Sequence, residues 1–205
     1  MSNSPSNKAI VQNHQEAVKA ADGLTETLIS SETIGNTKFL IVNRDKVKLP
    51  SGHEGEREYI VHPGAVLVIP MLDDGRLILE RQYRHPLGQV FIELPAGKID
   101  PMEPPLITGQ RELFEETGYS ANEWIYLTAQ HPCIGYSDEI IHVYLARGLQ
   151  AGQHQRDADE ALEIFEASLP ECLEMVQRGE ISDGKTIIAL FWLEKYLQGV
   201  WPAQS

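Results

Sequence analysis

The sequence has 205 residues, of which 42% are hydrophobic and 23% charged, which is the composition of a globular protein with a proper core. Its formal net charge of −13 argues against nucleic acid as a partner, because phosphate backbones attract a basic surface. No run approaches the length of a membrane helix, and residues 1–20 lack a signal-peptide pattern. The two cysteines suggest neither a disulfide framework nor a zinc site. We therefore expect a cytoplasmic protein without nucleic-acid or membrane partners.

The first part of the chain divides into a polar segment and a region of strand-like alternation. Residues 1–22 are polar, and we assign no chemistry to them. Apolar and polar residues partly alternate at 24–32 and 37–48, which predicts two strands with one wet face. These strands either form a small sheet of their own or pair with a second subunit. We therefore expect a β extension at 23–56, followed by a main domain at 57–205.

Four further strands are expected before the central helix. They are residues 57–62, 65–72, 76–84 and 88–93. The second of them is almost wholly apolar, as in a buried strand. Because Asp73, Asp74 and Gly75 form a hairpin turn signal, we expect the second and third strands to pair with each other.

The chain after the central helix contains further strands and ends in helices. The expected strands are residues 123–130, 139–147 and 161–169. The expected helices are residues 170–179 and 185–198, with Ser182 or Asp183 as the cap of the last one. Residues 149–160 are polar and read as a loop. An order of strands, helix, strands and helices predicts an α+β fold with a mixed sheet, not a regular βαβ repeat.

The central helix combines an apolar side with a row of carboxylates. Pro104 and Pro105 can open it and Gly118 can end it. At about 100° per residue, three glutamates share one sector of the helix and four apolar residues lie on the other side. They are Glu112, Glu115 and Glu116, against Leu106, Ile107, Leu113 and Phe114. The helix also contains Gly109, which indicates the close approach of another segment.

Glutamates placed so close together repel one another unless a cation or solvent balances them. Glu112 and Glu116 are an i,i+4 pair of like charges, which destabilises a helix, and Arg111 relieves part of this repulsion. Hard divalent cations use carboxylate oxygens, and Mg²⁺ usually combines one or two of them with substrate phosphates. The alternative is a solvated acidic helix face that binds nothing.

The spacing around this helix resembles the box of the Nudix family. Five residues separate Gly97 from Glu103, and seven separate Glu103 from Arg111. The segment then continues as RELFEETGY, which matches the family pattern R-E-U-x-E-E-x-G-U apart from an aromatic last position. The resemblance implies a Nudix-type α/β/α sandwich with a mixed sheet and a metal-dependent hydrolase.

Three flanking segments resemble the ADP-ribose pyrophosphatase branch of this family. They are RQYR at 81–84, ELPAGKID at 93–100 and GYSDE at 135–139. The resemblance implies hydrolysis of ADP-ribose to AMP and ribose 5-phosphate by a homodimer, with Mg²⁺ or alternatively Mn²⁺. Two other readings stay open: a pyrophosphatase for another nucleoside diphosphate sugar such as GDP-mannose, and a Nudix domain that only senses a nucleotide.

The same resemblance implies roles for individual residues of the box. Glu112, Glu116 and the backbone carbonyl of Ala96 are the expected metal ligands. Glu115 either joins them as a ligand or orients Arg111. Glu115 and Arg111 are counted among the catalytic residues. The main role implied for Arg111 and Glu103 is to fix the loop against the helix.

Residues outside the box supply the remaining roles. The expected base is Glu160, with Glu163 and Glu139 as alternatives. The expected substrate-binding residues are Arg57, Arg84, Tyr136 and Glu139, of which Arg57 reaches the site from the partner subunit. Tyr136 either stacks on adenine or is a half-buried tyrosine of the core.

Overall fold

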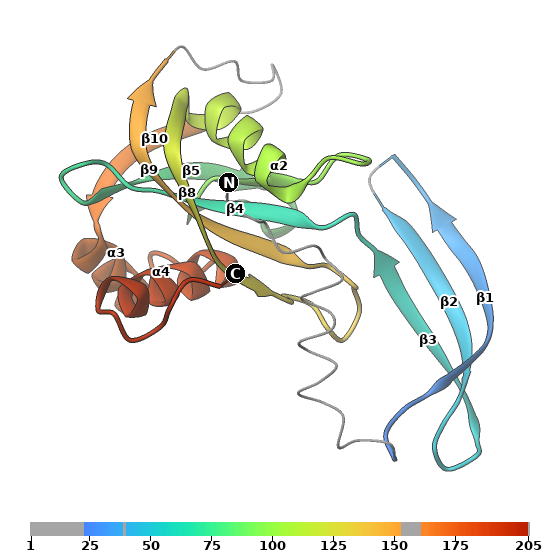
Figure 1. Ribbon diagram of the computed structural model, residues 1–205. Coiled ribbons are helices and arrows are strands. Elements are labelled where there is room, and N and C mark those ends of the chain that lie inside the picture. Colours follow the sequence, from blue (N-terminus) through green and yellow to red (C-terminus); the bar gives the residue numbers. More distant parts are fainter. Residues whose placement is uncertain (1–22, 39, 153–160, 205) are drawn as a thin grey trace. The chain divides into compact units, whose positions relative to one another are not determined.

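A computed structural model describes residues 23–38, 40–152 and 161–204 (Figure 1). These residues divide into two compact units. The smaller unit contains residues 23–63 and 133–140, and the larger unit contains residues 64–132 and 141–204, with the gaps just given. Among the described residues, no helix has the length and apolar character needed to span a membrane.

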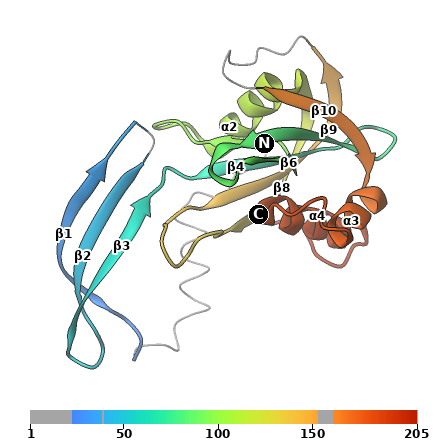
Figure 2. The ribbon, with the colours of Figure 1, turned by 180° about the vertical axis from the view of Figure 1, so that it is seen from behind.

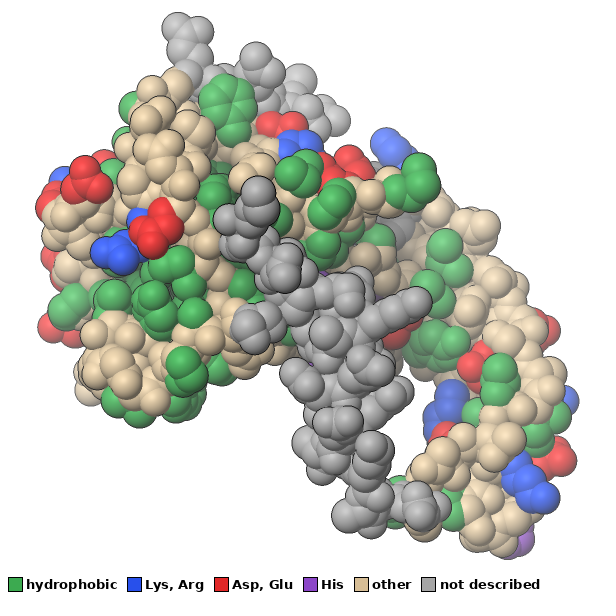
Figure 3. All heavy atoms as spheres, viewed as in Figure 1, with side chains coloured by type: hydrophobic (Ala, Val, Ile, Leu, Met, Phe, Trp, Pro, Cys, Tyr) green, Lys and Arg blue, Asp and Glu red, His purple; other side chains and the backbone are tan. Residues whose placement is uncertain are grey.

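The smaller unit is built on a three-stranded antiparallel sheet. Its strands are β1 (Thr27–Asn36), β2 (Ile41–Lys48) and β3 (Glu54–Val61), in that order across the sheet. They lie where alternation predicted strands, and β3 runs across position 56, at which the expected extension ends. Several large apolar side chains of β1, β2 and their connection are exposed, as Figure 3 shows. They are Leu28, Ile29, Ile34, Leu40 and Ile41.

The larger unit contains two sheets. The strands are β4 (Ala65–Pro70), β5 (Arg76–Arg84), β6 (Gln89–Glu93), β7 (Ala96–Lys98), β8 (Tyr119–Gln130), β9 (Ile141–Ala151) and β10 (Leu162–Ser168). A mixed sheet has the order β7-β4-β9-β8, with β4 and β9 parallel, and a second sheet has the order β10-β5-β6. β9 continues through residues 149–151, which the sequence had assigned to a loop.

Helices cover both faces of the mixed sheet. α2 (Pro105–Glu112) lies on one face, and α3 (Leu169–Gln177) and α4 (Gly184–Leu197) lie on the other, as the two ribbon views agree (Figure 1, Figure 2). α4 begins at Asp183, whose side chain accepts a hydrogen bond from the Thr186 N–H. The predicted α/β/α sandwich of an α+β protein is therefore confirmed.

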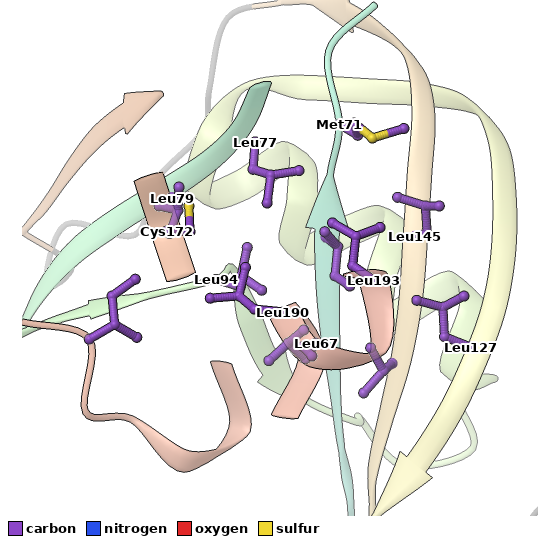
Figure 4. Packing of buried hydrophobic residues seen from close by; sticks show 14 of the residues in the cluster. Leu67, Met71, Leu77, Leu79, Leu94, Leu127, Leu145, Cys172, Leu190 and Leu193 are labelled. Atoms are coloured by element: carbon purple, nitrogen blue, oxygen red, sulfur yellow. The ribbon is translucent and has the colours of Figure 1, made fainter. Parts of the chain in front are cut away.

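Successive side chains of β4 alternate between the two faces of the sheet, so this strand packs against helices on both sides. Every residue of β4 is buried, as expected for a central strand covered on both faces. Leu67 and Ile69 point into the core shared with α4, where Leu190 and Leu193 are also fully buried (Figure 4). Burying a leucine side chain in this way contributes roughly 1.5–3 kcal/mol. The core therefore fixes the position of the strand that carries the site on its other side.

α2 packs against that other side of β4. A Cβ atom built on Gly109 would lie 3.1 Å from Val66 Cγ1 and 3.5 Å from Val68 Cγ2. The close approach predicted from Gly109 is thus confirmed, and the segment that approaches is β4. In contrast, Ile107 was expected on the apolar face and is exposed, because the helix turns its small residues, Thr108 and Gly109, toward the sheet.

The predicted pairing of the strands around the Asp73–Gly75 turn is wrong. The turn forms, with Gly75 at φ +88°, but β4 and β5 separate into different sheets and share only an isolated bridge between Met71 and Leu77. β4 already has β7 and β9 on its two edges, so no edge remains for β5. β5 pairs instead with β6 and β10.

Candidate active site

Arg111 joins the loop after β7 to the acidic face of α2. Its Nε and Nη2 groups donate to the Glu103 carboxylate at 3.2 and 3.1 Å, and Nη2 also donates to Lys98 O at 3.1 Å. Its Nη1 group donates to Glu112 Oε1 at 2.7 Å and to Glu115 Oε2 at 3.0 Å. The hydrogen bond from Arg111 lowers the pKa of Glu103, and the carboxylates raise the pKa of Arg111. Arg111 therefore neutralises part of the acidic face and holds the loop in place.

The helix widens into a π turn (Leu113–Thr117) directly after α2 and ends at Gly118, with φ +78°. Such turns, with i→i+5 hydrogen bonds, are often found at functional sites. Here Glu116 is only 3% exposed, whereas the Glu115 side chain is 40% exposed and bonded to Arg111. Glu115 and Glu116, which follow each other in the sequence, therefore have different surroundings.

Glu112 and Glu116 meet the backbone of β7. The Ala96 N–H donates to Glu116 Oε2 at 3.1 Å. A Cβ atom built on Gly97 would lie 1.9 Å from both Cδ and Oε1 of Glu112, so only glycine permits this approach. The structure therefore brings together Ala96, Glu112 and Glu116, the three residues expected to hold a metal.

This arrangement fits a hard divalent cation whose coordination is completed by substrate phosphates. Among the described residues, no group of three His, Cys, Asp or Glu side chains could hold a metal ion by side chains alone. Two glutamates beside a strand backbone nevertheless offer two carboxylates and one carbonyl. That is the small oxygen set that Mg²⁺ uses when substrate phosphates complete its coordination. The donor chemistry is therefore compatible with the cation.

A second charged cluster surrounds Glu93, at the end of β6. Arg84 donates from Nε to Glu93 Oε1 and from Nη2 to Oε2, both at 2.7 Å. Lys185 Nζ donates to Glu93 Oε2 and, at 2.9 Å, to Asp183 Oδ2. Burial opposes the ionisation of Glu93, but Arg84 and Lys185 outweigh it and hold the pKa of Glu93 below its ordinary value.

Arg84 was predicted from the sequence, but Glu93 and Lys185 were missed as site residues. Glu93 is 2% exposed and stands between Ile92 and Leu94. A glutamate inside an apolar strand was the available signal, since such a carboxylate is buried only when it has a partner. The sequence could not identify this partner, because Lys185 lies 92 residues further along the chain.

The other predicted substrate-binding residues lie in the smaller unit. Arg57 and Tyr136 line a hollow of about 230 Å³. Arg57 forms an ion pair with Glu26, and a hydrogen bond with Cys133 raises the pKa of Tyr136. Glu139 lies 3.7 Å from His62 Nδ1. The structure thus places Arg57 and Tyr136 around one hollow, with Glu139 close by in the sequence.

The predicted base, Glu160, lies outside the described residues. Of the alternatives, Glu163 is exposed on β10 and accepts a hydrogen bond from Arg81 Nη1 at 2.9 Å.

Comparison with known proteins decides the family. The NUDIX domain model matches residues 61–188. The chain belongs to the NUDIX domain family. This confirms the resemblance drawn from the spacing of Gly97, Glu103, Arg111 and the glutamates that follow, and the matched region contains all of them.

Two relatives are similar to this chain over most of its length. An ADP-ribose pyrophosphatase of Bacillus subtilis (strain 168) is 39% identical over 173 residues, which are 83% of this chain and 94% of the relative. A methanol dehydrogenase activator of Bacillus methanolicus is also 39% identical over 173 residues, covering 82% and 92%. A crystal structure of an ADP compounds hydrolase shares the fold, with a TM-score of 0.77, 24% identity and coverage of 85% and 95%.

Proposed function

We propose that this NUDIX protein hydrolyses the diphosphate of ADP-ribose to AMP and ribose 5-phosphate, with Mg²⁺ as its cofactor. The observation that carries the proposal is the meeting of Glu112 and Glu116 with the backbone of Ala96 and Gly97. The similarity to an ADP-ribose pyrophosphatase over most of both chains supports the choice of substrate.

The residues of the site divide the work as follows. Glu112, Glu116 and the Ala96 carbonyl would hold the cation. A bound divalent cation neutralises phosphate charge and lowers the pKa of a coordinated water. Arg111 keeps Glu112 and Glu115 oriented and thereby keeps the helix and loop in register. Glu160 remains our candidate for the base that removes the proton of the attacking water, with Glu163 and Glu139 as alternatives.

Substrate recognition is assigned to the four residues predicted from the sequence. The Arg84 side chain is 41% exposed, and its guanidinium suits a phosphate oxygen. Arg57, Tyr136 and Glu139 are assigned to the nucleoside, in keeping with the hollow that Arg57 and Tyr136 line. We further propose a homodimer, because the smaller unit exposes apolar side chains that a second copy would cover. A cytoplasmic location stays a prediction from the sequence.

A coupled phosphatase assay tests the substrate directly. ADP-ribose, GDP-mannose and dinucleotides are compared with and without Mg²⁺, and phosphate released from the monoester products is measured. We expect Mg²⁺-dependent hydrolysis with a preference for ADP-ribose.

The other outcomes of this assay are equally informative. A preference for GDP-mannose would retain the metal site but reject the assigned recognition residues. No hydrolysis by the folded protein would reject the enzyme and favour a nucleotide-sensing NUDIX domain.

A further inference from the structure

The charged cluster around Glu93 connects Arg84 to the segment that leads into the candidate metal site. Glu93 ends β6, and Ala96 begins β7 three residues later. Three virtual bonds between successive Cα atoms cover at most about 11 Å. The carboxylate that anchors Arg84 is therefore attached to the same short segment as the Ala96 carbonyl and Gly97.

The hydrogen bonds of Arg84 leave one edge of its guanidinium available. Nε and Nη2 are both used by Glu93, in the two-point geometry typical of arginine and a carboxylate. Nη1 has no hydrogen bond to the part of the chain that the structure describes, and the side chain is 41% exposed. A guanidinium held in this way can present Nη1 to a phosphate oxygen.

Two buried carboxylates act on Arg84. Glu80 lies directly opposite Glu93 in the register of β5 and β6, and the two residues are 1% and 2% exposed. Both raise the pKa of Arg84, Glu93 through the largest contribution. A second cation beside Glu93 would share this carboxylate with Arg84 and limit its pull on the guanidinium.

Lys185 supplies that second cation from the first turn of α4. Its ammonium group binds Glu93 Oε2, the oxygen that also accepts from Arg84 Nη2. The next residue of the helix, Thr186, accepts a hydrogen bond from the Leu94 N–H at 3.0 Å. The start of α4 thus holds both the carboxylate of Glu93 and the backbone that follows it.

We propose that Glu93 and Lys185 are positioning residues for substrate binding, which hold the Arg84 guanidinium with Nη1 turned outward to the diphosphate. Lys185 acts through Glu93 and Arg84 and does not itself contact the substrate. The inference rests on the proposed function only in requiring a substrate with a diphosphate.

A double-mutant cycle tests this inference. Lys185→Met keeps the aliphatic stem and removes the ammonium group, and it is made in the unchanged chain and in Arg84→Ala. KM is measured for whichever of ADP-ribose and GDP-mannose the unchanged chain hydrolyses, so a wrong substrate assignment does not obscure the result. We expect Lys185→Met to raise KM about tenfold, the value of a charge-assisted hydrogen bond, with kcat within about twofold. We expect no further rise in KM when Arg84→Ala is already present.

Two variants separate positioning from a general loss of structure. Lys185→Arg restores the positive charge and should recover most of the KM. Lys195→Met removes an ammonium group of the same helix. This group pairs with Glu194, so the variant should leave KM unchanged. If Lys185→Met does not fold, Glu93→Gln combined with Lys185→Met removes both buried charges together, and it should also raise KM.

Three results would overturn the inference. One is an unchanged KM in Lys185→Met or in the combined variant. The second is an equal rise in KM with and without Arg84, which would mean direct contact between Lys185 and the substrate. The third is a change in the Mg²⁺ concentration needed for activity in place of a change in KM, which would mean that Lys185 acts through the Ala96 segment.

Discussion

At the scale of single residues, the candidate site depends on how closely backbone and side chain approach each other. Gly97 touches the Glu112 carboxylate so closely that no β-carbon fits between them. Glu116 accepts a hydrogen bond from the neighbouring Ala96 N–H. These contacts place two carboxylates beside the backbone of β7. The addition of a single atom to this backbone would disturb the arrangement.

We predict that Gly97→Ala removes most of the activity and leaves the fold intact. The new methyl group would lie 1.9 Å from Glu112 Cδ, so the carboxylate must move by more than an ångström. A displacement of this size in a catalytic group costs about 100-fold in rate. The measurement is kcat beside a thermal unfolding curve.

Gly184→Ala is the matched control, because nothing lies within 4 Å of its added Cβ. It should keep full activity. An active Gly97→Ala protein would show that the position of Glu112 is not critical.

At the scale of elements, a strand that is buried on both faces disfavours the charged form of the side chains it carries. β9 is buried from Ile141 to Ala146, and it carries His142, which is 1% exposed. The hydroxyl group of Tyr126 lies 3.3 Å from His142 Nδ1. Burial, with a smaller contribution from His131, lowers the pKa of His142 to about 4. This histidine is therefore neutral in the folded protein at neutral pH.

We predict that His142 makes the protein less stable as the pH falls from about 6.5 to about 4.5. In this range the unfolded chain takes up a proton at His142 and the folded chain does not, so the free energy of unfolding decreases. At about 1.4 kcal/mol for each pKa unit, the loss is about 2–3 kcal/mol. Urea unfolding at a series of pH values measures it.

His142→Asn provides the control, because its amide oxygen can replace Nδ1 as the acceptor for Tyr126 while nothing titrates. Its stability should depend less on pH over the same range. Glu93 and Glu103, whose pKa values are also lowered, add their own loss only at more acidic pH. Identical pH profiles for the two proteins would contradict the assignment to His142.

At the scale of the whole molecule, the larger unit has an extensive core, whereas the three-stranded sheet of the smaller unit buries little. Of the apolar side chains in β1–β3, only Val47 of the described residues is buried. A three-stranded sheet with such exposed apolar groups is stabilised when another surface covers it. This is the physical basis of the proposed homodimer.

We predict that removal of residues 1–48 yields a monomer that has lost most of its activity. The deletion takes away β1 and β2 and most of the exposed apolar side chains of the smaller unit, so the proposed dimer contact is lost. Light scattering after size-exclusion chromatography measures the mass, and the phosphatase-coupled assay measures the activity. Removal of residues 1–22 alone is the control and should change neither. A fully active monomer would contradict a site shared between subunits.

The sequence by itself determined the local features of this protein. Pro104 and Pro105 at the start of α2, Gly118 after the π turn and the spacing of the box led to the helix, its glutamates and the family. Alternation located the strands, because each of these signals acts between residues close in the chain. Gly109 even indicated a close approach, although it did not identify β4 as the segment that approaches.

Only the tertiary structure decided which distant segments meet. It separated β4 from β5 despite the turn between them, because β4 had both edges occupied. It joined Glu93 to Lys185 across 92 residues, and it buried Glu116 beside the Ala96 N–H while leaving Glu115 more exposed, against Arg111. Such choices depend on competition for strand edges and on the pairing of buried charges. Neither is a property of any single stretch of sequence.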